Sequence, residues 1–271
     1  MKAGAAKCYT LVSEQKRNSV FNLVEKNLGK CHSPNQDNPV VFVHHLSQVI
    51  DRVDVIIHDW NEEQILALSN LTQLIKARDQ CLVPEGGCMV PHEIRLQLGA
   101  ITDSTFENYA KEEWDFSKYG LDYSHVADVS LRTNVFWGSL MNPLVSPKIN
   151  LRAIKPMTMS LNQVLNYRTP FFLELLSQNC TVSGLALYLE VRFIATVSST
   201  MGWKSCHQRD PYTFILSQPI ESCQANELLQ GTFSYSVQNK KITTEVETII
   251  KLKDVTSEFH FTEIRKDTMI S

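Results

Sequence analysis

The stretch VDVIIHDW at residues 53–60 is a run of valine and isoleucine that ends on polar residues. Such a run predicts a strand that is buried on both faces, and VVFVHHL at 40–46 predicts a second strand of the same kind. A further strand, CYTLV, is expected at 8–12. A helical pattern at 19–30 follows the first strand, and a helix at about 62–78 and a strand around CLVPEGGCMVP at 81–91 close the series. The alternation of strands and helices favours a mostly parallel sheet, so we expect an α/β domain in the first ninety residues.

The pattern changes after Pro91 to long strands without helices between them, such as EIRLQLGAIT at 93–102. KITTEVETI at 241–249 alternates apolar and polar residues with a period of two, as a strand with one buried face does. We expect this half to be an antiparallel β-sandwich or barrel. Between the halves lies a partly helical segment with an unusually apolar patch. The patch consists of Val135, Phe136, Trp137, Leu140 and Met141.

Composition excludes several classes of function. The chain has 271 residues, is 43% hydrophobic and carries a formal charge of −3 without a basic stripe, so nucleic acid is not an expected partner. No apolar run reaches the length of a signal peptide or a membrane span, which predicts a protein of the cytosol or nucleus. Seven scattered cysteines without a CxxC pair favour reduced thiols. Adjacent His44 and His45 point to opposite faces of a strand, so no metal site is expected.

Several motifs stand in one order along the chain: Asp54 to Trp60, then Ala77-Arg78-Asp79, then Pro84-Glu85-Gly86-Gly87. In this order and spacing the chain resembles the protein arginine methyltransferase family, and the resemblance covers nearly the whole chain. It implies a Rossmann-like methyltransferase sheet followed by a β-barrel, with the boundary after residue 91. The resemblance also implies a dimerisation arm at about 121–150, inserted in the barrel domain of 92–271.

The chain departs from the family where the cofactor S-adenosylmethionine is bound. It is expected to begin just after the glycine-rich turn, so that the methyltransferase sheet is truncated, and no GxGxG occurs in it. Val12 stands where the resemblance implies an acidic residue that binds the ribose. Ser47-Gln48 stands where it implies an acidic residue near the adenine. We therefore expect this chain to bind no cofactor.

The substrate side departs as well. Family enzymes hold the substrate guanidinium between two glutamates, which neutralise and orient it. The aligned residues here are Asp59, a shorter acid, and Leu68, which has no charge. Glu62 or Glu63 could substitute, but acids in a first helical turn are more often solvated there. In the barrel loop His207 aligns with the family's histidine; an alternative alignment centres on Trp203.

The truncation has a structural consequence, because the absent first strand would lie in the middle of the family's sheet. The strands at 8–12 and 53–57 would then each expose an unpaired edge. Either these strands pair directly in a contracted sheet, or another segment or chain covers the gap.

Three functions follow from the resemblance. The leading hypothesis is a catalytically inactive, prozyme-like regulatory subunit that forms a heterodimer with an active arginine methyltransferase, which would supply the bound S-adenosylmethionine. The apolar patch would then be an interface; its alternative role is barrel core. The second hypothesis is an active arginine N-methyltransferase or a fragment of one, and the third is a freestanding module that binds arginine-rich peptides.

Overall fold

The computed structural model describes residues 6–11, 40–58, 68–102, 108, 112, 115–133, 135–137, 144–192, 207–208, 211–236, 241–252 and 255–266. The chain divides into two compact units. One comprises residues 1–56, 76–88 and 268–271, and the other comprises 57–75 and 89–267. The division expected after residue 91 stays a prediction.

Short parallel strands occur where the sequence predicts them. β1 (Cys8–Leu11) pairs in parallel with β2 (Val40–Val43), and the 3-10 helix η2 (Leu46–Gln48) follows. β3 (Val55–Ile57) forms a separate two-stranded sheet with β4 (Cys88–Val90). Two hydrogen bonds, from Cys88 N to Asp54 O and from His58 N to Val90 O, advance in the same direction along both strands, as in a parallel pair. The helix expected at 19–30 lies outside the described residues.

The prediction that 53–60 forms a strand buried on both faces is wrong for its described part. Val55 is exposed, and Ile57 exposes 76% of its surface. Among the described strands β3 pairs with β4 alone, and β1 pairs with β2 alone, so the contracted sheet is not seen either. An apolar run shows that a strand can be buried, but burial also requires an element that covers it.

The helix expected at about 62–78 is present as α2 (Leu68–Cys81). Leu71, Leu74 and Ile75 are buried on one side of it, which follows the spacing of an amphipathic helix. The strand expected around 81–91 is present in part, as β4 at 88–90, and a turn at 84–86 precedes it. Gly86 in that turn has φ +77°, a backbone conformation that favours glycine. A Cβ on Gly87 would lie 2.6 Å from the Val83 carbonyl oxygen, so this position requires glycine as well.

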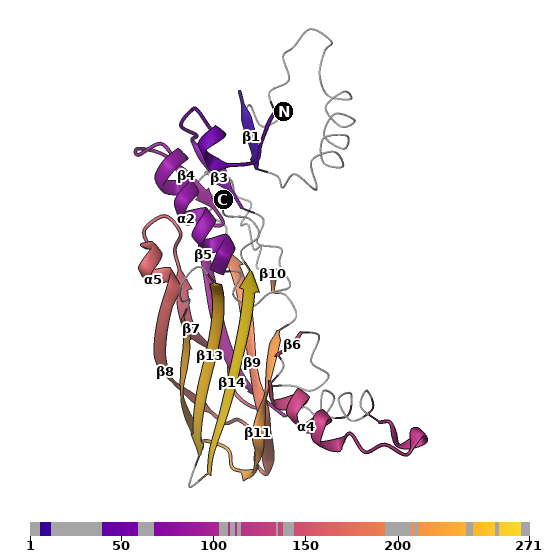
Figure 1. Cartoon of the computed structure of the whole chain (residues 1–271). Helices are drawn as coiled ribbons and strands as arrows, with labels where there is room; N and C mark the ends of the chain where they lie inside the picture. The colour runs from indigo at the N-terminus through magenta and orange to yellow at the C-terminus, as the bar shows by residue number, and fades with distance from the viewer. Residues whose placement is uncertain are drawn as a thin grey trace, which may run out of the picture. The chain divides into compact units, whose positions relative to one another are not determined.

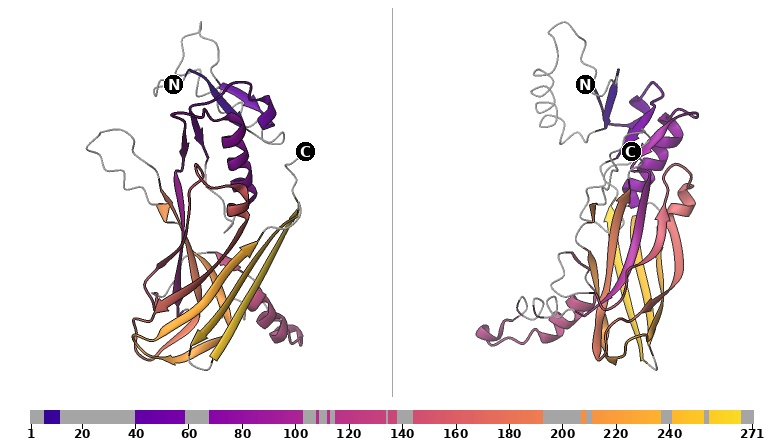
Figure 2. Two further views of the ribbon diagram at one scale, coloured as in Figure 1. Left: turned by 90° about the vertical axis from the view of Figure 1, so that its left-hand side faces the viewer. Right: turned by 180° about the vertical axis from the view of Figure 1, so that it is seen from behind.

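The second half of the chain is antiparallel, as predicted, and forms two sheets (Figures 1 and 2). The six-stranded sheet contains β5 (Glu93–Ile101), β6 (Val135–Trp137), β7 (Ile149–Ile154), β9 (Cys180–Arg192), β10 (His207–Gln208) and β11 (Tyr212–Cys223), in the order β6-β11-β9-β5-β7 with β10 on β9. The four-stranded sheet contains β8 (Asn166–Glu174), β12 (Leu228–Ser236), β13 (Lys241–Leu252) and β14 (Val255–Lys266), in the order β14-β13-β12-β8.

This arrangement differs from the closed barrel that we expected. Among the described strands, no backbone pairing joins one sheet to the other. The core of this unit is apolar, with fully buried side chains contributed by both sheets. Examples are Ile94, Leu96, Phe171, Leu173 and Phe233. Packing of side chains between two sheets fills a core without a closed ring of hydrogen bonds, so the hydrophobic pattern of the strands does not distinguish the two architectures.

A group of alternating charges fixes the register of β5 against β9. Glu93 lies opposite Arg192, and Arg95 lies opposite Glu190. Within each strand, Arg95 pairs with Glu93, and Arg192 pairs with Glu190 at 3.0 Å. If one strand slipped by one residue, its charged side chains would move to the buried face that carries Ile94. The register of β5 against β9 is therefore specific.

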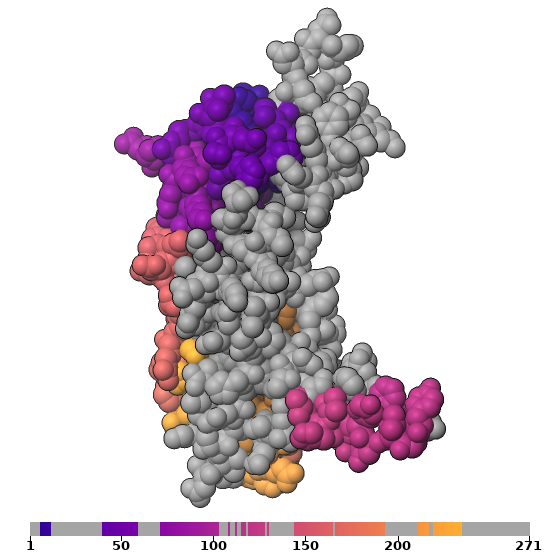
Figure 3. Space-filling model, in the orientation of Figure 1, coloured from indigo at the N-terminus to yellow at the C-terminus, as the bar shows by residue number. Residues whose placement is uncertain are grey.

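The arm expected at 121–150 is partly helical, as predicted. The 3-10 helix η3 (Ser117–Tyr119) lies just before the arm. The arm itself contains α4 (Ser124–Thr133) and then β6. α4 lies beside β11 and β14, and the segment from η3 to α4 extends away from the two sheets (Figures 1 and 3). Asp122 lies just before α4, and its carboxylate accepts a hydrogen bond at 2.9 Å from the backbone N–H of Ser124, the first residue of the helix.

Candidate functional site

The ends of β1 and β2 are where the resemblance places the cofactor contacts. Parallel neighbours bring their carboxyl ends to one edge of a sheet, so Leu11 and the residues after Val43 lie at the same edge. Leu11 is exposed. Gln48 Oε1 accepts hydrogen bonds from the backbone N–H groups of His44, at 2.6 Å, and His45, at 3.1 Å. The amide oxygen of Gln48 is therefore used to close its own turn.

A small polar cluster lies just beyond this turn. Lys7 Nζ and the Tyr9 hydroxyl both donate hydrogen bonds to Asp51 Oδ2, at 2.8 and 2.6 Å. The Lys7 hydrogen bond, followed by that of Tyr9, lowers the pKa of Asp51 below its ordinary value of 3.8. The same Asp51 contact raises the pKa of Lys7 above 10.5. The carboxylate of Asp51 thus has two partners within the chain.

These residues do not fit S-adenosylmethionine in the way that the family implies. Of the described residues at the ends of the two strands, Leu11 and 44–48, none carries a carboxylate. A ribose diol and an exocyclic amino group both need acceptors. The two hydrogen bonds of the turn use the amide oxygen of Gln48. The other polar group of this side chain is NH₂, which can only donate hydrogen bonds. Val12 lies outside the described residues, and no step through S-adenosylmethionine follows from this edge.

The two clamp positions are described only in part. Asp59 lies outside the described residues, and Leu68 is the first residue of α2. His207 lies in β10, where its backbone pairs with Val191 of β9. The assignment of these three residues to a degenerate substrate site stays a prediction.

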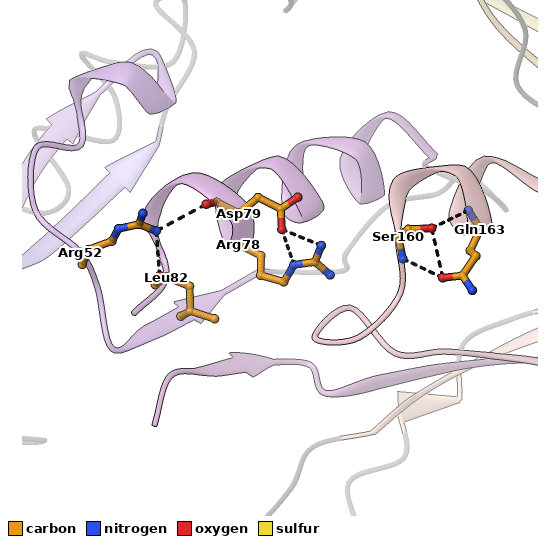
Figure 4. Close-up of polar contacts among 6 residues, drawn as sticks. All are labelled: Arg52, Arg78, Asp79, Leu82, Ser160 and Gln163. Carbon is orange, nitrogen blue, oxygen red and sulfur yellow. Dashed lines mark hydrogen bonds and ion pairs between the residues drawn. The ribbon is translucent and has the colours of Figure 1, made fainter. Parts of the chain in front are cut away.

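The motif Ala77-Arg78-Asp79 ends α2, and its polar groups stabilise that end (Figure 4). Arg78 Nη2 lies 2.6 Å from Asp79 Oδ1. The Arg52 guanidinium donates hydrogen bonds to the carbonyl oxygens of Asp79, at 3.4 Å, and Leu82, at 3.0 Å. A cation at this end of a helix satisfies carbonyl groups that lack a helical partner. This motif therefore has a structural role in the described chain.

The arm carries an exposed apolar surface. Phe116 is half-buried, and its ring centroid lies 6.2 Å from that of Tyr119 and 5.1 Å from that of Tyr123. Ala127 of α4 is buried. We call the exposed apolar residues of this segment the arm surface: Tyr119, Leu121, Tyr123, Val126 and Val129.

The predicted interface residues differ from this surface. The structure pairs Val135–Trp137 with β11 at the edge of the six-stranded sheet, a backbone position that suits the alternative role in the sheet. Leu140 and Met141 lie outside the described residues, and the interface assignment stays a prediction. Sequence reasoning missed the arm surface. Its signal was the spacing of Val126 and Val129, which share one helical face three residues apart.

Two kinds of site are not found in the part of the chain that the structure describes. No three or more histidine, cysteine, aspartate or glutamate side chains come together there as ligands of a metal ion. No helix of the described residues has the length and apolar character that crossing a membrane demands.

Comparisons with known proteins give one consistent family. No family model matches the chain. Protein arginine N-methyltransferase 1.1 of Arabidopsis thaliana is 26% identical over 258 residues, which are 91% of this chain and 62% of the relative. Protein arginine N-methyltransferase 1 of Dictyostelium discoideum is 26% identical over 186 residues, 68% of this chain and 53% of the relative. The chain thus spans between about half and three fifths of the length of these curated relatives.

Solved structures show the same fold. The enzyme-prozyme heterotetrameric complex of Trypanosoma brucei protein arginine methyltransferase 1 with S-adenosylhomocysteine matches with a TM-score of 0.75 and 16% identity, over 97% of this chain and 86% of that chain. Protein arginine methyltransferase 10 of Arabidopsis thaliana matches with a TM-score of 0.70 and 20% identity, over 97% and 83%. The chain shares the fold of the protein arginine methyltransferases, and the sequence relatives to which it is similar carry that name.

Proposed function

We propose that this chain is a catalytically inactive subunit that pairs with an active protein arginine methyltransferase through its arm, in the cytosol or nucleus. In this proposal the partner binds S-adenosylmethionine and transfers the methyl group. This chain supplies a surface that stabilises or activates the partner. The observation that carries the proposal is the arm surface.

An exposed apolar surface on a projecting segment favours a protein partner. Scattered exposed apolar residues are ordinary, but a contiguous patch marks an interaction site or a liability for aggregation. The arm also makes contacts of its own, since Asp122 accepts a hydrogen bond from the first residue of α4 and Gly120 ends η3 with φ +71°. A preformed surface loses less conformational entropy when it binds.

The strand edge at β1 and β2 supports the inactive half of the proposal. Val12, which stands at the ribose position, has no acceptor in its side chain, and the amide oxygen of Gln48 closes a turn. A hydrogen bond to a charged group contributes about 1.5–3 kcal/mol. The loss of two such contacts would weaken a micromolar complex by roughly 10²-fold or more.

A similar solved structure offers a precedent for the pairing. The Trypanosoma brucei assembly contains an enzyme and a prozyme in one complex. The likeness is one of fold, and the pairing of this chain with an enzyme is our proposal.

The proposal is tested by co-expression with active arginine methyltransferases of the same organism. We expect a stable complex by size-exclusion chromatography with light scattering, and a higher rate of peptide methylation by the complex than by the enzyme alone. Calorimetry of the isolated chain with S-adenosylmethionine should show no binding tighter than about 10 μM. Tight cofactor binding would instead support an active methyltransferase. Capture of arginine-rich peptides without any methyltransferase partner would support a freestanding binding module.

A further inference from the structure

Two cysteines lie opposite each other on neighbouring strands of the six-stranded sheet. Cys180 is the first residue of β9, Cys223 is the last residue of β11, and the antiparallel register makes them direct partners. Both are reduced in this structure. They are 43 positions apart in the sequence, so only the fold brings them together.

Directly opposite positions in an antiparallel pair, such as those of Cys180 and Cys223, are compatible with a disulfide. Directly opposite residues of an antiparallel pair have Cα atoms about 4.5 or 5.5 Å apart, and their side chains point to the same face. Disulfides occur for Cα separations of about 4.4–6.8 Å. In a disulfide the two Cβ atoms lie about 3.5–4.5 Å apart, slightly closer than the Cβ atoms of an average cross-strand pair. The bond therefore requires only a small approach of the two strand ends.

The ladder at this end is irregular enough to allow that approach. The register shifts between Ile215 and Ile220, and again between Ile220 and Cys223. Ser222, directly before the cysteine, has φ +54°, the left-handed conformation often found at a bulge. Beyond the pair, Gln224 Nε2 donates a hydrogen bond to Asn179 Oδ1 at 2.9 Å, which holds the two chain segments together.

The two thiols differ in access. Cys223 is fully buried, and its thiol donates a hydrogen bond to the Ile220 carbonyl oxygen at 3.2 Å. Cys180 is half-buried, so a small reagent can reach it. This difference assigns the first reaction to Cys180 and the second to Cys223.

We propose that Cys180 and Cys223 form a reversible cross-strand disulfide when the protein meets a low-molecular-weight disulfide. The Cys180 thiolate attacks one sulfur of the reagent, whose S–S bond breaks, and the released thiolate takes a proton. The Cys223 thiolate then attacks Cys180 Sγ, the mixed disulfide breaks, and the second small thiol leaves with a proton. Two protein thiols are oxidised, and one small disulfide is reduced to two thiols.

The bond would lock the open end of the β9–β11 pair. The chain that connects β9 to β11 includes β10 and therefore His207. Oxidation would close a loop that runs from Cys180 to Cys223, at the end of the strand pair where the register is irregular. Disulfides that close such loops stabilise proteins, and we expect a rise in the melting temperature of roughly 5–10 °C.

The test uses the full chain, treated with oxidised glutathione, alkylated without reduction and digested with trypsin. We expect one linked peptide pair, Thr169–Arg192 joined to Asp210–Lys240, because these peptides contain Cys180 and Cys223. Reduction should separate them and reverse the shift in melting temperature. The peptide that contains Cys206 ends at Arg209, so a bond to that residue is distinguished directly.

Three variants sharpen the result. In Cys223→Ala, glutathione should stay attached to Cys180 as a mixed disulfide, whereas Cys180→Ser should leave Cys223 unmodified. Cys88→Ser replaces an exposed cysteine of the other unit and should leave the linked pair unchanged. The wild-type peptide map requires no variant, so poor folding of a variant does not block the test. Absence of the linked pair, or a link from Cys180 to another cysteine, would overturn the proposal.

Discussion

The arm surface gives the sharpest prediction, because its contribution can be separated from stability. Tyr119, Leu121 and Val129 expose 66%, 49% and 45% of their surface. Complete burial of an apolar side chain contributes about 1.5–3 kcal/mol, so covering the exposed part of each gives about 1 kcal/mol. Changing all three to serine should therefore weaken a complex with an active arginine methyltransferase by about 3 kcal/mol, or roughly a hundredfold.

The same triple variant should fold normally, since all three side chains are already exposed, with at least 45% of their surface accessible. A matched control exists on the four-stranded sheet and its flank. Phe172, Leu176 and Leu228 expose 52%, 60% and 44% of their surface. Changing these three to serine removes a similar exposed apolar area away from the arm. Affinities measured by interferometry, with melting temperatures measured in parallel, separate binding from stability. An arm variant that binds within threefold of wild type, or a control that weakens as much, would refute the role of the arm.

Three further predictions concern the fold and its charges. Gly184→Ala should lower the free energy of unfolding by about 1–3 kcal/mol in a urea titration, because its Cβ would lie closer than 3.0 Å to the Phe214 carbonyl oxygen; unchanged stability would contradict the packing. Ser160→Ala, which removes the N-cap of α5 (Leu161–Leu165), should cost about 1 kcal/mol in the same assay. The carboxyl of Asp51 should titrate below pH 3.8 by NMR and return toward that value in Lys7→Met. Since its pKa is lowered in the folded state, its contribution to stability is complete above pH 3.8 and is lost as the pH falls through the lowered pKa.

The long antiparallel strands were predictable because their sequences contain the reasons for their burial. β5 carries Ile94, Leu96 and Leu98 on one face, and all three are fully buried. The charges that fix its register to β9 were visible in each strand, but their pairing was not. Glu93 and Arg192 are far apart in the chain, and only the register brings them opposite each other.

Short elements were harder to predict. α5 has only five residues and was missed, although Ser160 and Gln163 form a capping box that marks its start (Figure 4). The Arg52 cap of α2 could not be found from sequence, because it joins residues 27 and 30 positions apart. Burial of β3 was predicted wrongly, because the composition of a strand does not say whether a neighbour covers it.

A single substitution at the candidate cofactor site would restore only part of the binding free energy that the cofactor requires. Gln48→Glu would keep an oxygen for the turn and add a second one, which is worth about 1.5–3 kcal/mol as a charged acceptor. Micromolar affinity corresponds to about 8 kcal/mol, and Val12 at the ribose position would still offer no acceptor in its side chain. Several simultaneous changes are therefore needed before this edge could bind the cofactor as the family implies. In our proposal the arm surface needs no such change, since its apolar side chains are already exposed. Both features support our proposal that the chain is a subunit that binds an active arginine methyltransferase.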